Sequence, residues 1–162
     1  AAVYCITVVR DKHICNVLQI DFAQSLNVKE EQIFDGIRIF KLIADAGIDV
    51  DMISQFPLSG ASSGFSFTVS DKDFVPVLSI ASELRNRSPK TKISVSSGNC
   101  KLTVSGEAMR GTPGVSAKEF KAAASADADV RMITTSEIEI AMLVVKSDVD
   151  NVIAAIEKEF AE

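Results

Sequence analysis

The segment from Met109 to Gly114 has residue types that could bind an anion. Glycines that precede a helix can cradle a phosphate, because backbone N–H groups and the helix dipole both favour negative charge. The segment lacks the GxxxxGK[ST] spacing of a nucleotide-binding loop, so we expect no nucleotide chemistry there. His13, the single histidine, has no acid, base or cysteine at motif spacing. We therefore expect His13 to be an ordinary surface or strand-edge residue rather than a catalytic one.

The cysteines and the charge narrow the class of protein. Cys5, Cys15 and Cys100 form no CxxC pair and have no Cys/His spacing typical of a metal site. We expect reduced, buried thiols, with no metal and no cofactor. The formal net charge of -5 would repel a phosphate backbone, so nucleic acid is not an expected partner. No apolar run approaches the ~20 residues that cross a bilayer, and we expect a cytoplasmic protein without membrane contact.

An internal repeat organises the chain. One set of residues recurs at a constant offset, and each copy leads from a predicted helix through a short turn into a strand. The first set is Phe40, Ala44, Ala46, Asp49, Val50, Met52 and Ile53, and the second is Phe120, Ala124, Ala126, Asp129, Val130, Met132 and Ile133. Two similar modules are therefore predicted.

Hydrophobic periodicity predicts the elements within each module, since a strand alternates faces while a helix returns to one face every three or four residues. Phe65, Phe67 and Val69 alternate with polar residues, which predicts a half-buried strand. Gly47 is expected to end a helix. That helix is predicted from an apolar stripe at helical spacing, made of Ile33, Ile37, Phe40 and Ala44.

Further elements complete two strand-helix-strand-strand-helix-strand modules. Thr112-Pro113 is expected to cap and begin a helix. Strands are predicted at residues 3–9, 14–20, 92–96 and 102–106. The second module lacks a final strand, which the N-terminal strand could supply. We therefore expect a first domain at 11–98, inserted into a second domain made of 1–10 plus 99–162.

Three segments carry a resemblance to a known family. They are Ala46–Gln55 (AGIDVDMISQ), Gly106–Val115 (GEAMRGTPGV) and Met132–Ile138 (MITTSEI). Over nearly its whole length the chain resembles the tandem ACT domains of aspartokinases, and the GxxMxxxPGV loop and the ITTSEI segment are specific to that regulatory region. The resemblance implies an α+β fold of two ferredoxin-like βαββαβ ACT domains, with the first inserted into the second.

The resemblance also implies feedback inhibition of aspartokinase. Lysine, threonine or both would bind between ACT domains of two chains and shift the kinase toward an inactive state. The implied partners are the effector, a second copy of the chain as a homodimer, and an aspartokinase catalytic domain or large subunit. The sequence has no KFGGxS-type motif of the catalytic domain. We therefore expect a regulatory region or a separate small subunit, with no catalytic residues.

An effector amino acid needs N–H donors for its carboxylate and acceptors for its ammonium group, and a strand-to-helix turn supplies both. The resemblance places Asp21 in such a turn, but this turn lacks the family's Pro-Gly and is longer. Gln55 matches the family's effector-binding glutamine. Asp49 and Asp129 stand where the family commonly has Asn. Their carboxylates would favour a cationic group such as a lysine ammonium, unless both simply form solvated turns.

The resemblance adds candidates in the second module. Val130 would offer backbone groups to an effector on the partner chain. Thr135 and Ser136 could hold a carboxylate directly or through water, or could stabilise a tight turn between two strands. Ser59 matches a region of effector or catalytic-domain contacts.

Two alternatives of other classes stay open to different degrees. The altered turn that begins at Asp21 is compatible with a structural dimerisation module that has lost effector binding. RNA binding on a four-stranded sheet would need exposed aromatic residues in the central strands, and the sequence has no Trp and one Tyr. The sequence therefore favours the amino-acid sensor.

Overall fold

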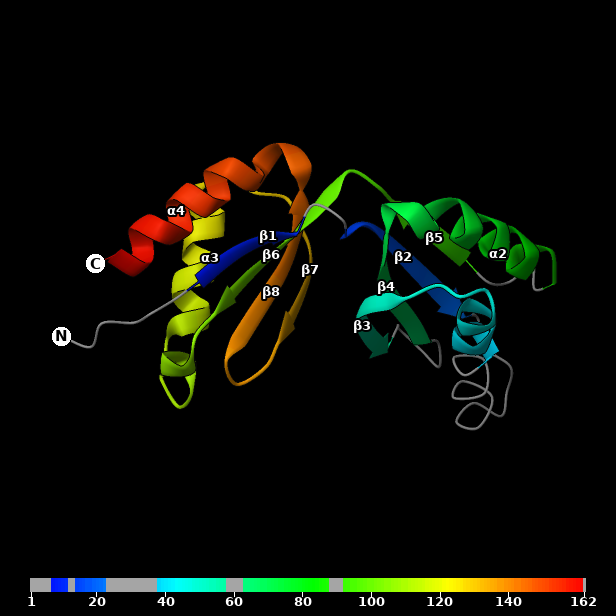
Figure 1. Cartoon of the computed structure of the whole chain (residues 1–162), viewed down its shortest axis with the longest axis horizontal. Helices are drawn as coiled ribbons and strands as arrows, with labels where there is room; N and C mark the ends of the chain where they lie inside the picture. Colours follow the sequence, from blue (N-terminus) through cyan, green and yellow to red (C-terminus); the bar gives the residue numbers. More distant parts are fainter. Residues whose placement is uncertain (1–6, 12–13, 23–37, 58–62, 88–91, 162) are drawn as a thin grey trace. The chain divides into compact units, whose positions relative to one another are not determined.

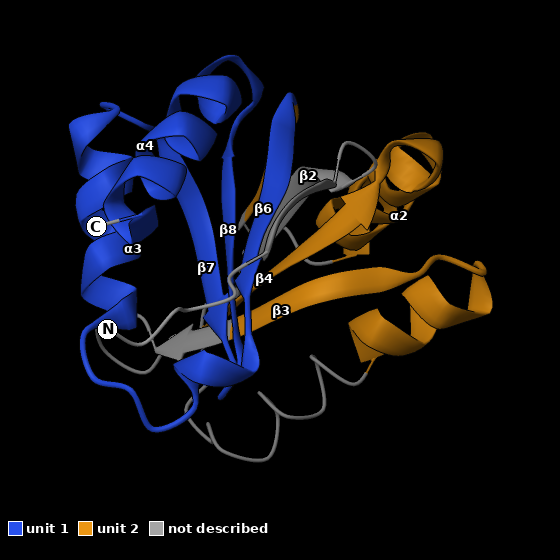
Figure 2. Cartoon of the chain, turned by 60° about the vertical axis from the view of Figure 1, so that its left-hand side comes forward, with its two compact units in different colours: residues 1–13, 98–162 blue, residues 14–97 orange. Residues whose placement is uncertain are grey.

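The computed structural model describes residues 7–11, 14–22, 38–57, 63–87 and 92–161 (Figure 1). The chain divides into two compact units, which Figure 2 distinguishes by colour. Unit 1 consists of residues 1–13 and 98–162, and unit 2 consists of residues 14–97. Unit 1 is thus assembled from both ends of the sequence, whereas unit 2 is one continuous segment.

Unit 1 is a four-stranded antiparallel sheet with two helices on one face (Figure 1). Its elements are β1 (Thr7–Asp11), β6 (Asn99–Ser105), α3 (Val115–Ser125), β7 (Val130–Thr135), β8 (Glu139–Val145) and α4 (Val149–Ala161). The strand order is β1-β6-β8-β7. Val9 lies opposite Thr103, so the N-terminal strand pairs with β6 from the other end of the sequence.

Unit 2 is a second four-stranded antiparallel sheet, with strand order β3-β4-β2-β5. Its elements are β2 (Ile14–Phe22), a helix over residues 38–45, β3 (Val50–Pro57), β4 (Ser63–Ser70), α2 (Phe74–Arg87) and β5 (Lys92–Ser96). In both sheets the strand that follows the first helix lies at one edge. In both sheets the strand that precedes the first helix, β6 in unit 1 and β2 in unit 2, lies between two neighbouring strands. The predicted α+β class and βαββαβ pattern are confirmed.

The repeat is also visible in local backbone detail. The pairing of β3 with β4 shifts register between Val50 and Ile53, and the pairing of β7 with β8 shifts between Val130 and Met132. Both irregularities follow the repeated Asp-Val pair at the start of an edge strand. In β3 the Met52 amide donates a hydrogen bond to the buried hydroxyl of Thr68, 3.0 Å away. Such a bulge re-aims the strand that follows it.

The core of unit 1 follows from alternation on β8 and from the helical period of α4. Ile140, Met142 and Val144 are buried on one face of β8, beside Leu102 and Val104 of β6. The helices cover this face with side chains at helical spacing. These are Val115, Ala122 and Ala123 of α3 and Val149, Val152 and Ile156 of α4. The apolar residues of α4 therefore recur at helical spacing and pack against the sheet.

The core of unit 2 is built around aromatic side chains. Phe67 and Val69 of β4 are almost fully buried, beneath Ile39 and Ile43 of the first helix and Val77 and Ala81 of α2. The Phe40 ring makes edge contacts with Phe65 and Phe67, with centroids 5.8 and 5.6 Å apart. Edge-to-face contacts of this kind add to the stability gained from burial.

Some sequence predictions were wrong in detail. Thr112-Pro113 does not begin α3, which starts at Val115 after Gly114 in the left-handed region. The Thr112 hydroxyl instead donates a hydrogen bond to the Ala108 carbonyl, at 2.7 Å. Asp21 is not in the turn after the first strand, because β2 continues to Phe22. The predicted helix end at Gly47 is confirmed, with φ of +71°.

Among the described residues, no helix is long and apolar enough to cross a bilayer. Ile33 and Ile37, which were part of the predicted helical stripe, lie outside the described residues.

Candidate functional site

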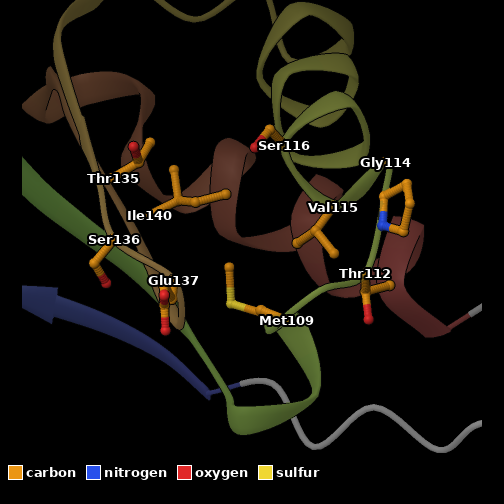
Figure 3. Close-up of a pocket in the computed structure, with 10 residues that line it drawn as sticks. Met109, Thr112, Gly114, Val115, Ser116, Thr135, Ser136, Glu137 and Ile140 are labelled. Atoms are coloured by element: carbon orange, nitrogen blue, oxygen red, sulfur yellow. The ribbon is translucent and has the colours of Figure 1, made fainter.

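Unit 1 contains a pocket of about 330 Å³ at the N-terminal end of α3 (Figure 3). Three segments form its wall: the loop between β6 and α3, the first turn of α3, and the turn between β7 and β8. The lining residues are Met109, Thr112, Pro113, Gly114, Val115, Ser116, Thr135, Ser136, Glu137 and Ile140. All three segments belong to unit 1, so the pocket is built within one sheet-and-helix unit.

The lining combines an apolar part with a polar part. Met109, Val115 and Ile140 are at most 9% exposed and belong to the core cluster of unit 1. We call these three residues the apolar wall. The polar part consists of the hydroxyls of Thr112, Ser116, Thr135 and Ser136 and the carboxylate of Glu137. A pocket with an apolar wall and a few polar groups is typical of small-molecule sites.

Backbone hydrogen bonds shape the loop that leads to α3. The Gly106 amide donates to the Ile138 carbonyl at 2.9 Å, and the Met109 amide donates to the Gly106 carbonyl at 3.0 Å. Gly111 and Gly114 have φ of +65° and +89°, which L-residues with side chains rarely adopt. The left-handed Gly114 lets the chain turn directly into α3. The loop is therefore held against the β7–β8 turn by its backbone.

The first turn of α3 brings unpaired donors to the pocket. The N–H groups of the first residues of an α-helix have no partner inside the helix. The flanking residue Gly114 has no side chain to cap them. Together with the helix dipole, these amides favour a negatively charged group such as a carboxylate.

An ion pair joins the two loops that border the pocket. The Arg110 guanidinium binds the carboxylate of Glu137, and its Nε lies 3.7 Å from a carboxylate oxygen of Glu107. All three side chains are largely exposed. Exposed ion pairs contribute little to stability, so this contact orients Glu137 more than it holds the fold together.

Thr135 and Ser136 are the predicted site residues that the structure places in the pocket lining. The Ser136 amide donates to the Glu139 carbonyl at 2.7 Å, which closes the turn between the strands. The Ile138 amide also approaches the Ser136 hydroxyl, at 3.4 Å. Ser136 thus lines the pocket and stabilises its turn, and its contact with a ligand carboxylate stays a prediction.

Asp129 and Val130 lie at the start of β7 and are not among the pocket-lining residues. The Asp129 carboxylate binds Arg131, with 2.6 Å between Oδ2 and Nη2. The Asp129 amide donates to the Asp148 carboxylate at 3.1 Å. Asp129 therefore already has a cationic partner on its own strand. Val130 is partly buried against the core of unit 1.

The remaining predicted site residues belong to unit 2. Asp21 is in β2, opposite Gly64 of β4 and Lys92 of β5. Gln55 is in the edge strand β3, opposite Phe65. Asp49 is exposed and directly precedes β3. Ser59 lies outside the described residues.

Sequence reasoning did not identify several residues of the pocket. Met109, Thr112, Pro113 and Gly114 were part of the recognised GxxMxxxPGV loop, yet that loop was interpreted only as the entry to a helix. Glu137 follows Ser136 in the recognised ITTSEI segment. The signal was therefore present in both segments, but only the folded chain shows that they border one pocket.

Among the described residues of unit 1, Glu119 has the largest shift in pKa. It lies one turn beyond Val115 on α3. Its side chain is 0% exposed, and neither carboxyl oxygen has a hydrogen-bond partner in the described structure. Burial raises the pKa of Glu119 to about 8, because desolvation penalises the charged form. At neutral pH this carboxyl group is therefore mostly protonated. No cluster of His, Cys, Asp or Glu in the described part of the chain could hold a metal ion.

Comparison with known proteins adds a family to this geometry. Residues 102–160 match the family model of the ACT domain. An aspartokinase from Bacillus sp. (strain MGA3) is 28% identical over 122 residues, which make up 75% of this chain and 30% of that protein. The chain therefore spans about 30% of the length of that curated relative.

Solved structures with similar folds agree with the sequence match. The regulatory subunit of aspartate kinase from Thermus thermophilus superposes with a TM-score of 0.80 at 22% identity, over 98% of this chain and 99% of that one. A chain in the crystal structure of aspartokinase alpha and beta subunits is 30% identical, with a TM-score of 0.76, over 96% of this chain and 97% of that one. The chain thus belongs to the family of aspartokinase regulatory regions, which are built from ACT domains.

Proposed function

We propose that this chain regulates an aspartate kinase by binding a free amino acid in the pocket of unit 1. The observation that carries the proposal is the meeting of Thr135, Ser136 and Glu137 with the first turn of α3 around one pocket. Both hydroxyl residues come from the segment that resembles the family's effector region. Lysine, threonine or both are the effectors that we propose.

The groups around the pocket match those of a free amino acid. The amides of the first turn of α3 and the hydroxyls of Thr112 and Ser116 can donate to the ligand carboxylate. The carboxylate of Glu137 can accept hydrogen bonds from the ligand ammonium group. The apolar wall is available for the aliphatic part of the ligand side chain. One ligand would thereby use the donors, the acceptor and the apolar surface together.

Regulation would follow if the ligand binds one arrangement of the assembly better than another. A coupling of about 1–3 kcal/mol between effector and kinase is sufficient for useful control. We propose that two copies of the chain associate through their ACT domains and that the kinase domain belongs to the same chain or to a large subunit. E. coli aspartokinase III, a more distant protein of similar fold at 21% identity, has been crystallised with lysine and aspartate.

The domain arrangement is part of the same proposal. We propose that unit 2 is an ACT domain inserted into a second ACT domain, unit 1. The pairing of β1 with β6 supports this, since the two strands lie on either side of unit 2 in the sequence.

A structural dimerisation module without effector binding is the second candidate. Two ion pairs favour it, because Asp129 is paired with Arg131 and Glu137 is paired with Arg110, so both carboxylates that could attract a cationic group already have a partner. Unit 2 also lacks the family's Pro-Gly after its first strand.

Calorimetric titration with lysine, threonine, methionine and isoleucine separates the two candidates. We expect heat of binding and a raised Tm with at least one ligand, because a ligand that binds only the folded state stabilises it. Thr135→Val and Ser136→Ala should weaken that binding, whereas Thr103→Val on β6, outside the pocket lining, should not. If wild-type protein shows neither heat nor stabilisation with all four ligands, the structural role is correct.

A further inference from the structure

The first helices of the two units differ at repeat-related positions. Ile39 of unit 2 is 4% exposed and belongs to its core, as an apolar residue should. The equivalent residue in unit 1 is Glu119, which is 0% exposed and has no hydrogen-bond partner in the described structure. One repeat therefore buries an isoleucine where the other buries a carboxyl group.

At the next repeat position both units have a phenylalanine, but the two rings lie in different environments. Phe40 packs against Phe65 and Phe67 on the sheet of unit 2. The equivalent Phe120 on α3 is 40% exposed. Ala122 of α3 is buried, whereas the equivalent Leu42 is only partly buried. Ile43 and the equivalent Ala123 are buried in both units, so the two helices share one buried face and differ mainly at its edges, where Phe120 is exposed and Ala122 is buried.

This orientation leaves two unfavourable environments next to each other on α3. A carboxyl group without a partner is buried, and a large aromatic ring is partly in water. A partial turn of α3 about its axis would bring Phe120 onto the sheet and move Glu119 to the rim of the helix, where its carboxylate could reach water. The same motion would relieve both unfavourable environments.

We propose that α3 is a two-position helix, and that its position, with Glu119 inside or outside, sets the affinity of the unit 1 pocket. The second half of this statement rests on the proposed function. Val115 and Ser116, at the start of α3, line the pocket, so a turn of the helix moves part of the pocket wall. A ligand that fits the pocket of this structure holds Glu119 inside.

The surroundings of Glu119 determine how it responds to pH. The hydrophobic core of unit 1 that packs on this side of the sheet includes the thiol of Cys100, and Asn99 of β6 is the other buried polar residue described in unit 1. The charged groups described along the seam of α3 with α4 are Lys121, paired with Glu159 at 2.7 Å, and Lys118, which lies 5.8 Å from the ring centroid of Phe160. Those groups already have partners.

Ionisation of Glu119 therefore favours the outward position. Burial raises the pKa of Glu119 to about 8, whereas a carboxyl group in water ionises near 4.5. Between about pH 4.5 and about pH 8 each pH unit changes the ratio of the two positions by about ten-fold, and the ratio levels off above pH 8, where Glu119 is ionised in both positions. The pocket of this structure should accordingly be less populated at high pH.

Hydrogen exchange resolved by mass spectrometry tests the position of α3 directly. The probe is the exchange of α3 amides relative to α4 amides, in the full chain, between about pH 7 and pH 9. The ratio removes the intrinsic pH dependence of exchange. Because α3 packs fewer apolar side chains in the outward position and opens more readily there, we expect an increase of up to about ten-fold for α3 in wild-type protein. Glu119→Ile, which installs the residue of the sister repeat, and Glu119→Gln should abolish the increase. Glu157→Gln on the exposed face of α4 should leave it unchanged.

One further variant and a titration distinguish the possible outcomes. Phe120→Ala should reduce the increase, because the outward position of Glu119 gains from burying this ring. Threonine and lysine titrations at both pH values should show an affinity loss of up to about ten-fold in wild type beyond that in Glu119→Gln. The comparison with Glu119→Gln cancels the change in affinity that comes from titration of the ligand's own ammonium group, because this change is the same in both proteins.

The outcomes separate this inference from the proposed function. Equal α3 exchange ratios in wild type and Glu119→Gln at both pH values would overturn the two-position helix, whatever the ligand does. Pocket affinity that stays constant while α3 exchange changes would overturn the link to the pocket. Absence of binding at pH 7 in every variant contradicts the proposed function, and the exchange result then still decides the position of α3.

Discussion

Gly47 of unit 2 and Asp127 of unit 1 are repeat-related residues that follow a helix in the left-handed conformation. Their φ angles are +71° and +50°, and Asp127 is the residue other than glycine with positive φ in the described structure. Glycine adopts this conformation without steric cost, whereas aspartate tolerates it less well. The same backbone is thus served by a favourable residue in one unit and by a strained one in the other.

Exchanging these residues should change stability in opposite directions. We expect Asp127→Gly to raise the free energy of unfolding by about 0.5–1 kcal/mol, since relief of the strain exceeds the added flexibility of the unfolded chain. Gly47→Asp should lower it by a similar amount. Urea denaturation followed by circular dichroism measures both variants. A lower stability of Asp127→Gly would show that the aspartate side chain contributes more than its backbone strain costs.

Glu119 should make the stability of the protein depend on pH. Its folded pKa of about 8 lies above its ordinary value of 4.5, so the folded state binds the proton more tightly than the unfolded state. The associated stability is complete below about pH 4.5 and is lost as the pH rises toward 8. The loss is on the order of 5 kcal/mol over this range, at 1.36 kcal/mol for each unit of pKa shift.

Glu119→Gln removes the titrating group and should flatten this dependence. The free energies of unfolding of wild type and variant, measured from about pH 5 to pH 9, should diverge progressively in favour of the variant. Glu157→Gln provides the matched control at an exposed position. Parallel curves for wild type and Glu119→Gln would mean that the carboxyl group is not buried without a partner.

At the scale of elements, the N-terminus of α3 is the part of unit 1 on which the pocket most depends. The repeat and the pair Thr112-Pro113 predicted this helix, because repeat-related residues lead from a helix into a strand and a hydroxyl before a proline is typical of a helix start. The start of α3 was predicted two residues too early. Thr112 has the residue type of a helix cap, but its hydroxyl binds the Ala108 carbonyl instead. Which partner a hydroxyl finds depends on the fold of the preceding loop.

Gly114→Ala should weaken both the loop and the pocket. An added Cβ would meet no atom within 4 Å, so the expected cost comes from the φ of +89° alone. We expect a loss of about 1–2 kcal/mol in unfolding free energy together with weaker amino-acid binding. Gly114→Asn should lose less, because asparagine tolerates the left-handed region better. Equal behaviour of the two variants in thermal denaturation would contradict this origin of the effect.

At the scale of the whole molecule, the repeat was the most informative feature of the sequence. It predicted two modules of one pattern, and the missing last strand of the second module pointed to the N-terminal segment. The compact units divide at residues 13/14 and 97/98, and the insertion of one ACT domain into the other, with limits at 10/11 and 98/99, stays a prediction. The site was harder to predict, because Asp49 and Asp129 were chosen from positions where the family commonly has Asn. A matching position does not reveal that Arg131 binds Asp129.

Removal of unit 2 tests whether unit 1 folds from its two separate segments. Asp11 of β1 lies opposite Lys101 of β6, so the ends left after deletion of residues 14–97 are neighbours in one sheet. We expect a chain with a short Gly-Asn linker in place of those residues to keep cooperative thermal unfolding and the β1–β6 pairing. A variant that also lacks residues 1–13 should be much less stable. Equal stability of the two shortened chains would contradict the role of β1.

The central claim is that a free amino acid binds in the pocket of unit 1. The measurement that tests it most directly is the change of backbone amide NMR shifts of ¹⁵N-labelled protein on titration with lysine and with threonine. We predict saturable shifts concentrated at Val115, Ser116, Ser136 and Glu137 for at least one of the two ligands. Shifts that remain unchanged with both ligands, or that saturate only at residues outside this pocket, would contradict the account.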